Sequence, residues 1–180
     1  MAERINVLFI APKQPPCVRQ IVNDLRSKQE LVEGHIEIVR PFDNNIVAVC
    51  NDEGVINGMP FNRELNNGTF IFGPMFLCKE RLGEDGYQLD GLNETELVRY
   101  QKQFAKPEVL VNWGGHYMAL PMALFNEALG PDISISEWGC DMMSHPLLHF
   151  IRGSKLGTYW ELAMVDRCAD CGHHCRLYRV

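Results

Sequence analysis

The C-terminal segment of the chain concentrates side chains that could bind a metal ion. It runs Cys168-Ala-Asp-Cys171-Gly-His-His-Cys175, which places five thiol or imidazole groups within eight residues. Cys168 and Cys171 have the spacing that lets two thiolates converge on one ion, and Gly172 directly after them permits a tight turn. Thiolates and imidazoles are ligands that Zn²⁺ prefers, so the segment predicts a structural zinc knuckle.

The remaining ligands of this predicted site can be assigned in two ways. A structural zinc is four-coordinate, so the three cysteines of the segment need a further ligand, which His173 or His174 could provide locally. Alternatively, Cys140 and His145 could join the first two cysteines and pin the C-terminal segment to the second half of the chain. His149, one helical turn after His145, is a further candidate.

A catalytic zinc is the alternative to a structural one. It would keep one position open for water and need a nearby base, for which Glu137 and Asp170 are the candidates. The chain lacks the Pro-Cys-x-x-Cys sequence that a zinc deaminase would require. We therefore expect a structural zinc whose removal costs folding free energy, on the order of 10 kcal/mol in small modules.

Two other patterns could support catalysis but favour structural roles. The paired glycines of Trp113-Gly-Gly-His116 could expose backbone amides as an oxyanion hole, yet the chain has no Gly-x-Ser-x-Gly nucleophile motif. A turn with His116 near a helix start is the preferred interpretation. Cys17, Cys50 and Cys78 lie in or beside apolar runs, where inert thiols are usual. We expect no catalytic residues and no enzymatic activity.

Composition and charge limit the possible partners. The 180 residues are 46% hydrophobic and 22% charged, which is typical of a folded globular protein. A net charge of −6 argues against a broad basic face for nucleic acid and suits a basic protein partner. No apolar run approaches the roughly 20 residues of a membrane span, and the Val7 to Ala11 run is too short for a signal peptide. We expect a cytoplasmic protein with no membrane contact.

The first half of the chain alternates strand and helix patterns. Ile5 to Ile10 predicts a strand, and apolar residues between Val18 and Val32 predict a helix that ends at Gly34. His35 to Arg40 and Asn45 to Cys50 predict a β-hairpin. We expect an antiparallel sheet with the first helix packed on one face.

The second half begins with the clearest helix start. Asn93-Glu-Thr-Glu96 has the pattern of a capping box, and apolar residues continue at helical spacing to Phe104. A boundary is expected near residues 105 to 112. Further predicted elements are helices over Tyr117–Leu129 and Met142–Ile151 and strands over Ile133–Ile135 and Tyr159–Val165.

These elements predict an α+β fold, with a mostly antiparallel sheet packed with helices and a C-terminal α/β extension that ends in the zinc knuckle. We expect residues 1–105 and 106–180 to form a domain and an extension, although one continuous domain is also open.

The segment Cys50-Asn-Asp-Glu-Gly-Val-Ile-Asn-Gly-Met-Pro-Phe-Asn-Arg63 is polar, contains glycine and lies between predicted strands. It could be a binding loop, or a pair of turns whose asparagines satisfy backbone groups, and the residue types favour neither. The same segment carries a resemblance. With His35-Ile-Glu-Ile-Val-Arg-Pro-Phe42, Gly68-Thr-Phe-Ile-Phe-Gly73 and the capped helix at Asn93, residues 4 to about 105 resemble an uncharacterised domain family of phages and mobile elements.

This resemblance implies an accessory protein that acts in the cytoplasm of a bacterial host. Such acidic proteins are often inhibitors of host defence, so the resemblance implies a non-enzymatic binding protein directed against a defence nuclease. The partner we expect is a Cas9-type effector with its guide RNA, which would make the chain an anti-CRISPR protein, or else a restriction enzyme. Direct contact with nucleic acid is expected to be weak or absent.

Two other classes of function stay open from the residues. One is a metal-dependent enzyme acting on nucleotides or nucleic acid through Glu137 or Asp170. The other is a regulatory module that binds DNA through the knuckle, with Arg167, Arg176 and Arg179 contacting phosphates.

Overall fold

The computed structural model describes residues 3–83, 86–113, 116–123, 149–153, 160–167 and 174–178. The chain divides into two compact units, Met1–Glu108 and Val109–Val180. Both contain β-sheet, and the described helices α1 (Leu25–Val32) and α2 (Glu94–Gln103) belong to the first unit. The fold is α+β, with mostly antiparallel strands.

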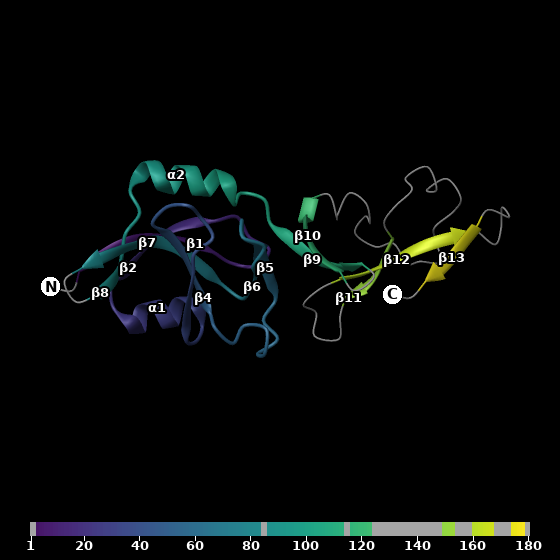
Figure 1. Ribbon diagram of the computed structural model, residues 1–180, viewed down its shortest axis with the longest axis horizontal. Coiled ribbons are helices and arrows are strands. Elements are labelled where there is room, and N and C mark those ends of the chain that lie inside the picture. The colour runs from purple at the N-terminus through teal and green to yellow at the C-terminus, as the bar shows by residue number, and fades with distance from the viewer. Residues whose placement is uncertain are drawn as a thin grey trace. The chain divides into compact units, whose positions relative to one another are not determined.

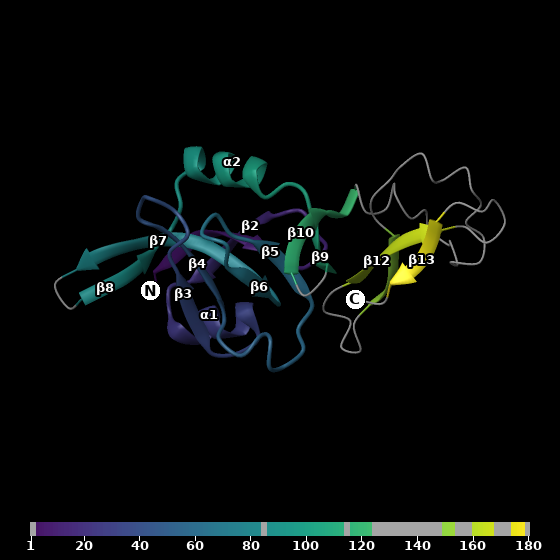
Figure 2. The same ribbon diagram turned by 45° about the vertical axis from the view of Figure 1, so that its right-hand side comes forward.

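The first unit is built on a six-stranded sheet. The strand order is β2-β1-β7-β4-β3, and β8 pairs with the C-terminal half of β7. All of these neighbours are antiparallel. Figure 2 shows that β7 and β8 continue as a two-stranded ribbon at one end of the sheet. The strands are β1 (Arg4–Ile10), β2 (Cys17–Val22), β3 (Ile36–Val39), β4 (Ile46–Asn51), β7 (Met75–Gly83) and β8 (Gly86–Asp90).

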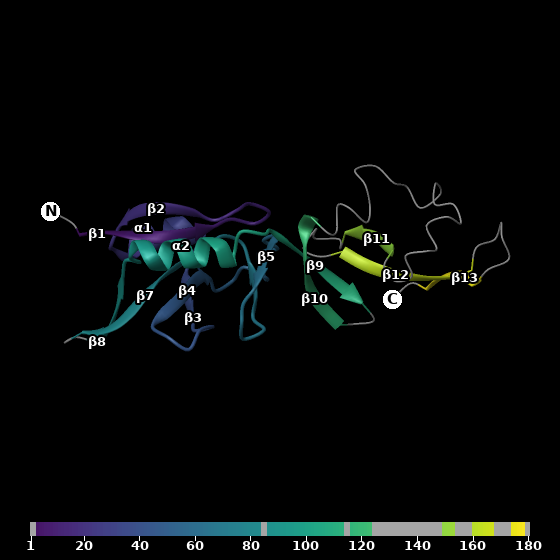
Figure 3. The same cartoon turned by 90° about the horizontal axis from the view of Figure 1, so that it is seen from above.

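The two helices cover opposite faces of this sheet (Figures 1 and 3). Because successive side chains of a strand point to opposite faces, β4 contributes to two cores. Ile46 and Ala48 join the core under α2, whereas Val47 and Val49 join the core under α1. A sheet buried on both faces explains why β4 is apolar without alternation. A short antiparallel pair, β5 (Phe61–Glu64) and β6 (Phe70–Phe72), completes the unit.

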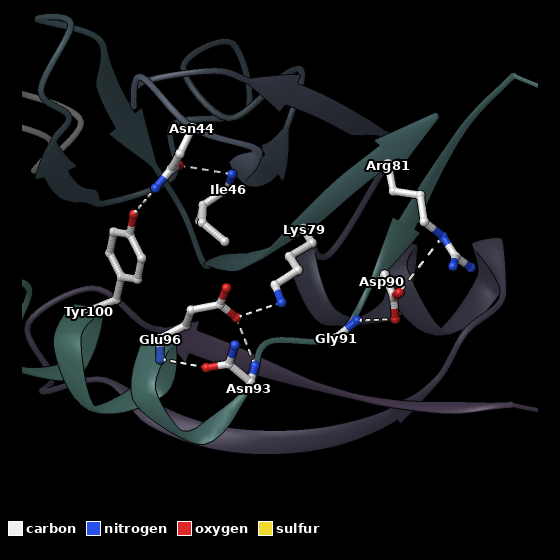
Figure 4. A network of polar contacts seen from close by, with 9 residues as sticks. All are labelled: Asn44, Ile46, Lys79, Arg81, Asp90, Gly91, Asn93, Glu96 and Tyr100. Carbon is white, nitrogen blue, oxygen red and sulfur yellow. Dashed lines mark hydrogen bonds and ion pairs between the residues drawn. The ribbon is translucent and has the colours of Figure 1, made fainter. Parts of the chain in front are cut away.

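Several sequence predictions are confirmed here. The opening strand is β1, and the predicted hairpin is the antiparallel pair β3 and β4. The capping box is also present at the start of α2. Asn93 Oδ1 accepts from the Glu96 N–H at 2.9 Å, while a Glu96 carboxylate oxygen accepts from the Asn93 N–H at 2.8 Å (Figure 4).

The helix predicted between Val18 and Val32 is wrong in its first part. Residues 17–22 form β2, which pairs with β1 along its whole length, and the helix begins only after Asp24. Asp24 caps it by accepting from the Ser27 N–H at 2.7 Å. The β-branched residues of Cys17–Val22 suit a strand, and pairing with β1 outweighs their helical spacing. The apolar residues between Val18 and Val32 therefore belong to two elements, β2 and α1.

The second unit contains a five-stranded sheet of order β10-β9-β12-β11, with β13 paired to β12. The β9–β12 pair is parallel, whereas β11 and β13 are antiparallel to β12. The strand predicted over Tyr159–Val165 corresponds to β12. These strands are β9 (Glu108–Trp113), β10 (His116–Pro121), β11 (His149–Gly153), β12 (Trp160–Arg167) and β13 (His174–Tyr178).

Two predicted helices of this unit are wrong where they can be compared. Residues 117–121 belong to β10 and residues 149–151 to β11, so each segment begins or ends in a strand. The spacing of the apolar residues in both segments fits a helix as well as a strand. Pairing with neighbouring strands favours the strand. The rest of both segments, and the predicted strand Ile133–Ile135, lie outside the described residues.

Candidate functional site

The predicted zinc ligands fall mostly outside the described residues, namely Cys140, His145, Cys168, Cys171 and His173. Of the others, His174 and Cys175 begin β13, where His174 pairs with Arg167 of β12, and His149 begins β11. Within the part of the chain that the structure describes, no group of three or more potential ligands could hold a metal ion. The zinc knuckle stays a prediction.

The residues considered for catalysis divide in the same way. Trp113 ends β9 and His116 begins β10, so His116 starts a strand rather than the helix that the sequence suggested. Glu137, Asp170 and the two glycines between Trp113 and His116 lie outside the described residues.

The segment between β4 and β5, here called the β4–β5 loop (residues 52–60), is anchored to the end of α1. Its anchor is the buried side chain of Asn51. The Asn51 amide donates to the carbonyls of Val32 and Glu33 at 3.2 and 3.1 Å, which satisfies backbone groups at the end of α1. Asn51 Oδ1 accepts from the Glu53 N–H at 2.8 Å. The loop therefore starts from a fixed position on α1.

Backbone hydrogen bonds hold the rest of the β4–β5 loop. The Asn57 N–H donates to the Glu53 carbonyl at 2.8 Å, and the Met59 N–H donates to the Gly54 carbonyl at 2.9 Å. Gly54 is buried against the Phe72 carbonyl, where a Cβ atom would lie only 2.5 Å from that oxygen. Only glycine fits this position without a shift of the backbone. The loop is a compact hydrogen-bonded structure.

The tip of this loop exposes large apolar side chains. Val55 and Ile56 are 62% and 83% exposed, the latter the highest value among the exposed large apolar residues of the described part. Asp52 and Glu53 precede them and are also exposed. The turn interpretation is confirmed at Asn51, whose side chain satisfies backbone groups, whereas the binding-loop interpretation stays a prediction for the solvent-facing tip.

The surroundings of the loop are acidic. Glu33 at the end of α1 and Glu37 on β3 are exposed. Burial, and after it the charges of Glu37 and Asp52, raise the pKa of the nearby Cys50 thiol to about 12. The negative potential at this end of the sheet disfavours a thiolate.

Asn62 and Arg63, the last residues of the polar segment 50–63, are buried and therefore not accessible to a partner. The Asn62 amide donates to the carbonyls of Ile10 and Gly73, both at 2.8 Å. The Arg63 guanidinium donates to the carbonyls of Gln14 and Asn62 at 2.8 and 2.7 Å. The residue types around Arg63 do not indicate that its side chain lies in the core.

The burial of two cysteines leads to a reactivity prediction. Burial is the main cause that raises the pKa of the Cys50 and Cys78 thiols from 9.0 to about 12, whereas Cys17 is exposed. A pulse of iodoacetamide at pH 8 should alkylate Cys17 and spare Cys50 and Cys78, as measured by peptide mass spectrometry. In urea all three should react. If Cys50 in the folded protein were alkylated as fast as Cys17, the Cys50 thiol would not be buried in the core.

The same thiols predict a loss of stability at alkaline pH. In the unfolded chain they ionise near the ordinary pKa of 9.0, but in the folded protein only near 12. The unfolded state therefore binds fewer protons between these values, so the free energy of unfolding should fall as pH rises from about 9 to 12. Urea titrations at stepped pH, with Cys50→Ala and Cys78→Ala for comparison, measure this contribution.

Comparisons with known proteins give one match. A family model described as a domain of unknown function, DUF3846, matches residues 5–105, which include α1, α2 and the six-stranded sheet. Neither the search of the curated proteins nor that of the solved structures found a match. No helix of the described residues is long and apolar enough to cross a membrane.

Proposed function

Since the chain belongs to the DUF3846 family, whose function is unknown, we propose from its surface that it is a non-enzymatic binding protein that inhibits a bacterial defence nuclease. The specific partner is a Cas9-type effector with its guide RNA, or a restriction enzyme, in the cytoplasm of a bacterial host. The β4–β5 loop makes the contact with a basic protein surface, and direct contact with nucleic acid is weak or absent.

The exposed apolar tip is the observation that supports this proposal. Binding interfaces depend on a few apolar anchors surrounded by polar groups, and Ile56 with Val55 has this character beside Asp52 and Glu53. The hydrogen bonds of the loop fix the anchors before binding, so little conformational entropy is lost on association. At 83% exposure, the Ile56 side chain buries little apolar surface within the fold.

Charge supports a basic partner. The chain carries a net charge of −6, and four exposed carboxylates lie on or next to the loop, at Glu33, Glu37, Asp52 and Glu53. Nucleases bind phosphates with basic surfaces, so such a surface complements this end of the sheet. Electrostatic complementarity of this kind mainly raises the association rate and makes it depend on salt.

A binding and cleavage assay tests the proposal. The purified chain is added to guide-loaded Cas9 and to restriction enzymes, with binding followed by interferometry and DNA cleavage by gel electrophoresis. Ile56→Arg should weaken binding at least tenfold, because an apolar anchor is replaced by a charge that the basic surface repels. The double variant Asp52→Lys, Glu53→Lys should slow association and reduce its salt dependence.

Val98→Arg is the matched control, since Val98 is also exposed, at 51%, but lies on α2. It should bind and inhibit as the unmodified chain does. The proposal fails if none of these nucleases is bound or slowed. The role of the loop fails if Ile56→Arg inhibits as well as Val98→Arg.

We also propose a structural zinc ion in the second unit, with Cys168, Cys171 and Cys175 as ligands. His173 or His174 would supply the fourth ligand, or Cys140 and His145 would join the first two cysteines. The antiparallel pairing of Arg167 with His174 supports the local set, because it brings together the backbone at both ends of the sequence 168–173. The soft donors of these residues fit Zn²⁺.

A further inference from the structure

A polar groove of about 570 Å³ lies on the face of the first unit that α2 covers, away from the β4–β5 loop residues. This volume falls within the range of small-molecule sites, which is about 300 to 1,000 Å³. Three separate elements line the groove: the β3–β4 turn, the β5–β6 turn and the C-terminal half of α2. The lining residues that matter below are Phe42, Asp43, Asn67, Arg99, Tyr100 and Gln103.

Side-chain hydrogen bonds fix the β3–β4 turn against α2. The Asn44 amide donates to the Tyr100 hydroxyl at 3.1 Å, and Asn44 Oδ1 accepts from the Ile46 N–H at 3.0 Å (Figure 4). The half-buried Phe42 ring packs on the Tyr100 ring with 4.9 Å between centroids. Phe42 thus forms the apolar part of the groove, and the buried Tyr100 beneath it sets its position without a ligand.

The β5–β6 turn is fixed in the same way. The Gln103 amide donates to Asn66 Oδ1 at 3.1 Å, which ties this turn to α2. Asn67 Oδ1 accepts from the Thr69 N–H at 3.2 Å. The Asn67 oxygen is therefore used within the turn, and its amide N–H groups have no acceptor among the described residues. They are available to an acceptor on a ligand.

The charges of the groove are separated. Arg40 is bound by both carboxylate oxygens of Glu80, so its charge is balanced. Arg99 and Asp43, in contrast, form no ion pair within the described ranges. Arg99 lies with its guanidinium carbon 5.5 Å from the Tyr100 ring centroid and is otherwise exposed. The groove thus presents one cation and one anion that do not neutralise each other.

We propose that this groove binds a guanine nucleotide. A guanidinium forms paired hydrogen bonds with phosphate oxygens, and the free Asn67 amide adds a further donor, which assigns the phosphate to Arg99 and Asn67. A carboxylate only accepts hydrogen bonds, so Asp43 selects a base with adjacent N–H donors, as guanine has at N1 and N2. The half-buried Phe42 ring, which rests on the buried Tyr100 ring, supplies the apolar wall for the base.

Calorimetry on the full chain tests the proposal, with GMP as the probe. AMP, guanosine and inorganic phosphate are the comparison ligands, because each lacks one of the features used in the argument. GMP should bind at least tenfold more tightly than each of them. Equal binding of inorganic phosphate would overturn the proposal in favour of a simple anion site, and absence of GMP binding at millimolar concentration would also overturn it.

Two variants assign the contacts. Arg99→Gln should weaken GMP binding at least tenfold, because a charged hydrogen bond to phosphate is lost. Its control is Lys102→Gln, which removes the same charge from the same exposed helix but does not line the groove, and it should bind GMP unchanged. Asp43→Asn should reduce the preference for GMP over AMP. Equal GMP affinity in Arg99→Gln and Lys102→Gln would overturn the proposal.

This test is independent of nuclease inhibition, since the groove and the β4–β5 loop share no residues. GMP binding can therefore be absent while nuclease inhibition is observed, and the reverse is also possible.

Discussion

Arg63→Ala is expected to lower the free energy of unfolding of the first unit by about 3 to 5 kcal/mol. Arg63 is 1% exposed, and its guanidinium donates to carbonyls of three separate segments. These are Gln14 between β1 and β2, Asn62 on β5 and, at 3.4 Å, Phe104 at the end of α2. Alanine would leave a cavity and remove the Arg63 donor from all three carbonyls, of which those of Asn62 and Phe104 are in buried hydrogen bonds.

The experiment must report on the first unit alone. The three tryptophans of the chain, at 113, 138 and 160, all lie in the second unit, so their fluorescence does not follow the first. Hydrogen exchange of peptides from β1, β7 and α2 should instead show the loss. Arg63→Lys should recover less than half of it, because one ammonium group cannot span carbonyls that the planar guanidinium joins.

Arg26→Ala is the control for this variant. Arg26 is exposed, and its ion pair with Glu30 is a surface pair four residues apart on α1, so the free energy of unfolding should hardly change. A change in Arg63→Ala no larger than that of Arg26→Ala would show that the three carbonyls are satisfied without Arg63.

Removal of zinc should have a comparably large effect on the second unit. We expect one zinc ion per chain by elemental analysis. Cys168→Ser with Cys171→Ser should abolish it, and a loss on the order of 10 kcal/mol of apparent binding free energy should unfold the region that the ion stabilises. The tryptophans of the second unit make fluorescence the suitable measurement for this variant.

Cys17→Ser is the control, because Cys17 is an exposed free thiol of the first unit. It should leave the metal content unchanged. Further single variants separate the ligand sets: loss of zinc in Cys140→Ser and His145→Ala supports the upstream set, whereas loss in His173→Ala or His174→Ala supports the local one. A purified chain without any metal would exclude both.

The sequence predicted the elements whose signals are local. The capping box at Asn93 and Glu96 is complete within four residues, and the hairpin of β3 and β4 joins neighbouring strands, so both were found. The apolar spacing from Val18 to Val32 predicts one helix, but its first part is a strand that pairs with β1. A spacing pattern holds no information about such pairing. Spacing likewise predicts a helix at Tyr117, which lies in β10 because β10 pairs with β9.

The candidate sites show the same division. The segment of residues 50–63 was recognised as a possible binding loop from its composition, but its sequence did not reveal that Ile56 is exposed while Arg63 is buried. The groove was missed entirely. Its residues come from turns and a helix far apart in the chain, joined by contacts such as that of Asn44 with Tyr100. Only the folded chain brings them together.

The position of β7 at the centre of the sheet has a consequence for synthesis on the ribosome. β1 pairs early with β2, yet its other neighbour arrives 65 residues later, since Ile10 pairs with Met75. β4 can pair with β3 as soon as both are synthesised, but its other edge stays unpaired until β7 is made. A two-stranded hairpin is marginal alone, so the nascent chain emerges with open strand edges until β7 closes them together. One late strand therefore sets when the inner edges of β1 and β4 are closed in the growing chain.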